Sequence, residues 1–216
     1  SSLCGFDVLG LLKQHRGKYY GHLRHLAGQD LDSDIDLEGW ESERFFLPLR
    51  IYAHLEVLVY LCTGYYKFGE DKLRNYAEQL LAVITHELFS LRCSQAVFEC
   101  SRYLESLRDQ ELKNNKIAEW AEKLSGGVTG YLQSLPSGGS LIIEAGWEEH
   151  ALYVQLYRHP DYQVEIIIHN RGAKKAEGLR TDLPTAYRLA CVPADEFKEN
   201  RKAYKYLRSI FIAKLA

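Results

Sequence analysis

The repeat of apolar residues changes at Pro136-Ser-Gly-Gly, residues 136–139. Before this breaker, leucines and aromatic residues recur at three- and four-residue steps, which is the period of amphipathic helices. After it, apolar and polar residues alternate, which is the period of half-buried strands. Helices first and antiparallel strands afterwards predict the α+β class. We therefore predict two domains, a helical bundle over residues 1–135 and a small antiparallel sheet with a C-terminal helix over residues 136–216.

The first domain is predicted to hold four to five helices joined by short polar breaks. Pro48 falls inside one of them and Gly126-Gly127 interrupts or ends another. The acidic stretch Gly28–Gly39 resembles a calcium-binding loop in part, but it lacks the required glycine and indicates a connecting loop instead. The expected helices are Cys4–Ala27, Glu41–Tyr66, Gly69–Leu91, Cys93–Leu107 and Asn114–Leu135.

The second domain is organised around a predicted β-hairpin. Its two alternating runs are His150–Tyr157 and Gln163–Asn170, and the segment Arg158–Tyr162 between them contains the Pro and Asp typical of a loop. One side of the hairpin is apolar throughout, which identifies the face that meets the core. Further strands are expected at Ser140–Glu144 and Thr185–Val192, and Ala194–Leu215 returns to helical spacing. The apolar side comprises Leu152, Val154, Leu156, Val164, Ile166 and Ile168.

A histidine and an asparagine occupy the open end of this hairpin. If Tyr157 pairs with Gln163, His150 lies directly across from Asn170 on the core-facing side. Opposite side chains have Cβ atoms about 4.5–5.5 Å apart, close enough for an amide to hold an imidazole in one orientation. That support is what a general-base histidine needs. The plainer interpretation is that both residues simply flank turns.

Composition excludes several classes of function. The net charge of −2 predicts no nucleic-acid surface, and no segment is apolar enough to span a membrane or act as a signal peptide. Five cysteines without a Cys-x-x-Cys pair indicate reduced thiols in a cytoplasmic setting. His22 and His25 have no nearby carboxylate or cysteine, so we predict no metal and no cofactor. The Ser-Ser start and the lack of methionine are typical of a trimmed fragment or of a sequence from which modified methionines are omitted.

The run Tyr131-Leu-Gln-Ser-Leu-Pro-Ser-Gly-Gly-Ser-Leu-Ile-Ile-Glu-Ala-Gly-Trp-Glu-Glu-His-Ala, followed by His169-Asn-Arg-Gly, resembles a segment of secreted effectors of intracellular bacteria. Those effectors carry a papain-like cysteine-peptidase domain with a Gly-Trp…His-Ala strand and a closing Asn-x-Gly. The resemblance covers residues 131–172. It implies that His150 is a general base oriented by Asn170, that Gly146 and Trp147 contact the substrate, and that the protein is delivered into a host cytosol.

The resemblance does not identify the nucleophile. Cys4 lies just before a predicted helix, where a thiolate is favoured, and it precedes the histidine and asparagine as in papain. Cys191 follows Asn170, an order found in other peptidases, but its strand-like surroundings favour a core thiol. The Gly-Asn-Cys-aromatic motif of the effectors does not occur in this chain.

Two hypotheses follow from the sequence. The first is a cysteine-peptidase-like hydrolase, of deubiquitinase type, with Cys4, His150 and Asn170 as catalytic residues and ubiquitin or a host protein as its substrate. The second is a non-catalytic protein-binding module whose nucleophile is absent or outside the chain. A thiol within reach of His150 favours the first hypothesis, and an exposed apolar patch on the helices favours the second.

Overall fold

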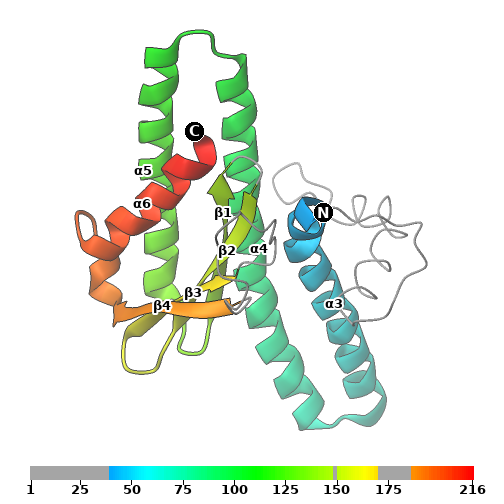
Figure 1. The fold of residues 1–216 in the computed structure, drawn as a ribbon. Helices are drawn as coiled ribbons and strands as arrows, with labels where there is room; N and C mark the ends of the chain where they lie inside the picture. The colour runs from blue at the N-terminus through cyan, green and yellow to red at the C-terminus, as the bar shows by residue number, and fades with distance from the viewer. Residues whose placement is uncertain (1–38, 148–149, 170–185) are drawn as a thin grey trace. The chain divides into compact units, whose positions relative to one another are not determined.

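The computed structural model describes residues 39–147, 150–169 and 186–216 (Figure 1). Helices come first, and a four-stranded antiparallel sheet and a further helix follow, which confirms the predicted α+β class. The predicted helix Cys4–Ala27 and the residues Cys4 and Asn170 lie outside the described residues. The elements are α3 (Gly39–Phe68), α4 (Asp71–Ser106), α5 (Gln110–Ser134), β1 (Ser140–Trp147), β2 (His150–Arg158), β3 (Gln163–His169), β4 (Ala186–Pro193), the 3-10 helix η1 (Ala194–Phe197) and α6 (Lys202–Leu215).

The chain divides into two compact units, Ser1–Ile84 and Thr85–Ala216. The first unit contains α3 and the beginning of α4. The second contains the rest of α4, α5, the sheet and α6. The change from helix to strand occurs near Pro136 as expected, but the units divide elsewhere, because α5 and the second half of α4 contribute to the same core as the sheet.

The helices are longer than their local signals indicate. The ranges Gly69–Leu91 and Cys93–Leu107 belong to the single helix α4, because no glycine or proline separates them. Asp109 caps the start of helix α5, and its side chain accepts hydrogen bonds from two backbone N–H groups of the first turn. It continues through Gly126-Gly127, since the burial of Val128 and other residues outweighs a cost of about 1 kcal/mol per glycine.

The sheet is an antiparallel meander in the order β1-β2-β3-β4. The predicted hairpin is present, but its register differs from the expected one. Arg158 pairs with Val164, and Tyr157 pairs with Glu165 rather than Gln163. The N–H of His159 donates to the carbonyl of Gln163 at 2.9 Å, which leaves a three-residue loop instead of five.

The conformation of Tyr162 explains the short loop. Its φ of 62° is in the left-handed region, and a three-residue hairpin loop commonly ends with such a residue. The Arg158 guanidinium lies 5.1 Å from the centre of its ring. The register therefore shifts by two residues. Because side chains alternate with a period of two, a shift of two leaves every side chain on its predicted face.

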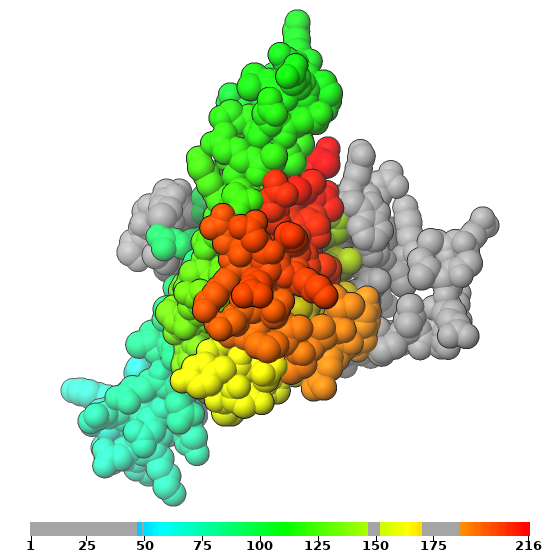
Figure 2. Space-filling view, turned by 90° about the vertical axis from the view of Figure 1, so that its left-hand side faces the viewer, coloured from blue at the N-terminus to red at the C-terminus, as the bar shows by residue number. Residues whose placement is uncertain are grey.

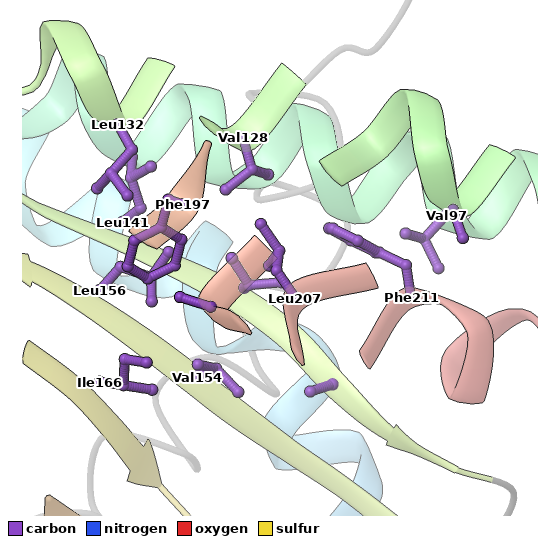
Figure 3. Close-up of a cluster of buried hydrophobic side chains, with 14 of the residues drawn as sticks. Val97, Val128, Leu132, Leu141, Val154, Leu156, Ile166, Phe197, Leu207 and Phe211 are labelled. Atoms are coloured by element: carbon purple, nitrogen blue, oxygen red, sulfur yellow. The ribbon is translucent and has the colours of Figure 1, made fainter. Parts of the chain in front are cut away.

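The core of the second unit lies between one face of the sheet and the helices α5 and α6 (Figure 3). The sheet contributes the predicted alternating set, including Val154, Leu156, Val164 and Ile166. Phe197, from η1, is 1% exposed and points into the centre of this cluster. The helices complete the core with Val97, Val128, Leu132, Leu207 and Phe211.

The two edges of the sheet differ. At the β1 edge, the backbone N–H of Ile142 donates to the hydroxyl of Ser90 on α4 at 3.0 Å, so the helix satisfies an edge group. On α5, Glu122 accepts a hydrogen bond from Tyr204 and forms an ion pair with Arg208, which ties α6 to α5. At the other edge, no further strand among the described residues pairs with β4.

Candidate functional site

Three of the predicted site residues, Gly146, Trp147 and His150, lie at one end of the sheet. Trp147 and His150 form the last pair of the β1–β2 hairpin, beside the pair Gly146–Ala151. Gly146 has a φ of 113°, a backbone conformation that favours glycine. In an antiparallel meander β3 ends where β2 begins, so His169, the residue before Asn170, belongs to the same end of the sheet.

The observed register differs from the one on which the expected pairing of His150 with Asn170 was based. The last described pair of the β2–β3 ladder joins Tyr153 to His169, and Tyr153 is three residues, or about 10 Å of strand, from His150. The prediction assumed a five-residue loop, and the three-residue loop moves β3 by two positions along β2. The observed register therefore does not support the inference that an amide on the opposite strand orients His150 as a general base. The catalytic roles of His150 and Asn170 remain predictions, since Asn170 lies outside the described residues.

The described cysteines fall into two groups. Burial raises the pKa of the Cys93 thiol to about 11, and burial also raises the pKa of Cys100, so neither is suited to act as a thiolate. Cys62 on α3 and Cys191 on β4 are exposed. Cys191 pairs with Glu165, five residues along β4 from the end of the sheet where His150 begins its strand. The candidate Cys4 lies outside the described residues.

An amide does orient an imidazole in this structure, but in a different pair of residues. On the face of the sheet opposite the core, the ring Nε2 of His169 is 2.8 Å from the side-chain oxygen of Gln155. An amide oxygen only accepts hydrogen bonds, so this ring nitrogen carries a proton. The Gln155 amide nitrogen donates in turn to the Ser140 hydroxyl at 2.8 Å. The sequence offered one signal for this pair, since both residues lie on the polar side of the hairpin.

A second polar cluster on this outer face is centred on Glu165. Its carboxylate accepts a hydrogen bond from Arg188 on β4 and lies 2.8 Å from the ring Nε2 of His159. The Arg188 hydrogen bond, followed by that of His159, holds the pKa of this carboxyl below its ordinary value. The ring of Tyr157 meets the His159 ring edge to face, with centroids 4.7 Å apart. These side-chain contacts link β2, β3 and β4 in addition to the backbone hydrogen bonds of the sheet.

A groove runs beside β4, the edge strand of the sheet among the described residues, and lies between β4, η1 and the start of α6. Figures 1 and 2 show β4 in orange next to the first part of α6. The groove has a volume of about 490 Å³, within the range of about 300–1,000 Å³ common for ligand sites. Glu196 and Lys202 contribute one charge of each sign. The apolar lining comprises Ile166, Leu189, Ala190, Val192, Pro193, Ala203 and part of Tyr206.

A β-bulge shapes this groove. Ile166 pairs with Ala190 and Ile167 pairs with Arg188, so Leu189 has no partner in the ladder. Neighbouring residues of a regular strand face opposite sides, but Leu189 and Ala190 both line the groove because of the bulge. Leu189 is nevertheless 47% exposed. This surface was not predictable from the sequence, because one extra residue does not visibly disturb the apolar alternation of such a short strand.

Tyr187 extends the apolar surface along β4. It is 39% exposed. Burial raises the pKa of Tyr206 in the groove wall, and the proximity of Tyr187 raises it further. Tyr187 and Leu189 are thus exposed apolar residues on a strand that no further described strand pairs with, which is an arrangement suited to binding another chain.

Within the described ranges, no group of three or more His, Cys, Asp or Glu residues is arranged to hold a metal ion. The described helices also include none with enough length and apolar character to cross a membrane. Comparisons of the chain with models of known protein families, with curated proteins and with solved structures find no match.

Proposed function

We propose that this chain is a protein-binding module that holds an extended peptide segment against β4. The observation that carries the proposal is the apolar groove directly beside β4, the edge strand of the sheet among the described residues. An edge strand offers backbone N–H and C=O groups for pairing, and an adjacent pocket can accept a side chain of the added strand. The partner is a segment of protein with a large apolar residue among residues of β propensity.

Backbone geometry supports strand addition at one point in particular. The N–H of Ala194 donates to the carbonyl of Tyr162 at 2.9 Å. Hydrogen-bonded pairs alternate along an antiparallel ladder, so the next such pair is Val164–Val192. Cys191 lies between Val192 and Ala190 in a non-hydrogen-bonded pair with Glu165, so it directs its N–H and C=O away from β3. Pro193 has no N–H, so pairing with an added strand has to end there.

The test is a displayed peptide library selected on the wild-type protein, followed by affinity measurements on purified peptides. We expect Leu189→Glu to weaken the selected peptides by about tenfold or more, because it replaces an apolar contact with a charge that has to lose its water when a peptide binds. The matched control is Leu112→Glu. Leu112 is 41% exposed on α5 and does not line the groove, so binding should persist.

Hydrogen exchange provides an independent readout. A bound strand should slow amide exchange at Cys191, whose N–H then gains a partner, whereas Val192 is already protected by β3. Selection of no peptide, or of peptides that bind Leu189→Glu as tightly as wild type, would contradict the proposal.

A second candidate function is thiol-dependent hydrolysis of a protein substrate such as ubiquitin. It is favoured by the sheet topology, which brings the strand that begins at His150 and the end of β3 to one end of the sheet. The experiment is labelling by a ubiquitin-derived, cysteine-reactive probe. Labelling that is lost in His150→Ala and in either Cys4→Ala or Cys191→Ala would establish this chemistry and identify the nucleophile. Equal labelling of all variants would indicate nonspecific alkylation.

A further inference from the structure

Helix α3 carries an exposed apolar stripe that the peptide-binding proposal does not use. Val59, Tyr60 and Tyr66 are 65%, 81% and 91% exposed. At 3.6 residues per turn they lie on one side of the helix, together with Thr63. The half-buried residues Leu58, Leu61 and Tyr65 lie on the opposite side. We call the residues Glu56, Val59, Tyr60, Thr63, Tyr66 and Lys67 the outer stripe.

A partner can cover the outer stripe without depriving the Thr63 hydroxyl, its central polar group, of a hydrogen bond. The Thr63 hydroxyl donates to the carbonyl of Val59 at 2.8 Å, so it already has a partner within the helix. Burying a hydroxyl is unfavourable chiefly when its hydrogen bond is lost.

The charges at the ends of the stripe indicate what covers it. Glu56 and Lys67 are both exposed and lie eleven residues apart, which is about 16 Å along a helix. In an antiparallel pair of α3 helices related by a two-fold axis, Glu56 of each copy lies beside Lys67 of the other. A parallel pair would instead place like charges together. Two-fold interfaces require such a self-complementary patch.

We propose that a second copy of this chain docks on the outer stripe, with the two α3 helices antiparallel. Val59, Tyr60 and Tyr66 form the apolar centre of the interface, and two symmetric Glu56–Lys67 contacts set its direction. The proposal is independent of the peptide groove, because the stripe belongs to the first unit and the groove to the second.

The first measurement is the dissociation constant of the dimer, from sedimentation velocity of the full chain over a wide range of concentrations. Tyr66→Glu should raise this constant by about tenfold or more, because it places a charge in the apolar centre. The control is Tyr76→Glu on α4, where the wild-type residue is 56% exposed and lies outside the stripe. That variant should dimerise like the wild type, and circular dichroism should confirm that both variants remain helical.

Charge exchange tests the direction of the pair. Glu56→Lys and Lys67→Glu should each weaken the dimer about threefold or more, since both symmetric contacts change from attraction to repulsion. The double variant should dimerise like the wild type. A chain that is monomeric at all concentrations overturns the proposal. A dimer that tolerates Tyr66→Glu, or a double variant as weak as the single ones, overturns it equally.

Discussion

Phe197 provides the most direct test of the core. Its ring is 1% exposed and lies between the sheet and the helices α5 and α6. Replacing a fully buried phenylalanine with alanine costs about 3–5 kcal/mol, through lost burial and the cavity that remains. Domains are typically stable by about 5–15 kcal/mol, so Phe197→Ala removes a large part of the total. At about 2–4 °C per kcal/mol, the melting temperature should fall by about 6–20 °C.

The assay has to report the second unit by itself, because two units need not unfold in one transition. Native-state amide hydrogen exchange, read in β2 and α5, gives the free energy of unfolding of that unit. The matched control is Phe98→Ala on α4, where the wild-type ring is 50% exposed and the expected loss is under about 1 kcal/mol. A loss for Phe197→Ala under about 1.5 kcal/mol, or no larger than that of the control, would refute the packing described above.

Three further predictions follow from contacts in the structure. Burial, followed by its bond to Glu122, raises the pKa of Tyr204 to about 12, so the folded state keeps this proton longer than the unfolded state. Stability should therefore fall between about pH 10 and 12, and denaturant titrations should show a smaller fall in Tyr204→Phe. A disulfide reagent followed by mass spectrometry should modify Cys62 and Cys191 quickly and Cys93 slowly, and fast modification of Cys93 would contradict its burial. Ser90→Ala should cost about 1–3 kcal/mol in urea unfolding, since it leaves an edge N–H without a partner, whereas Ser90→Thr keeps the hydroxyl.

The alternation of apolar residues was sufficient to predict the faces of the sheet. Val154 and Ile166 face the core as expected, because the face depends only on whether a position is odd or even. The register was not predictable in the same way. It depends on the left-handed conformation of Tyr162, and tyrosine has no particular preference for that conformation.

The polar contacts across the hairpin depend on the same register. The His150–Asn170 pairing followed from the assumed loop length, and the observed pair of His169 and Gln155 follows from the actual one. Continuity of α4 was also missed, because the predicted break near Arg92 had no breaker residue to support it. The groove depends on a bulge at Leu189, which only tertiary packing determines.

The position of α6 along the chain has a consequence for the order in which the protein assembles during synthesis. The core between α5 and the sheet is completed by Leu207, Phe211 and Leu215 of α6, the last of the described elements to be made. About 80 residues separate Leu135 from Leu215, so at roughly 5–20 residues per second the apolar face of α5 remains uncovered for about 4–16 s after it is made. During that interval the nascent chain presents a surface that chaperones bind and that can aggregate with other chains.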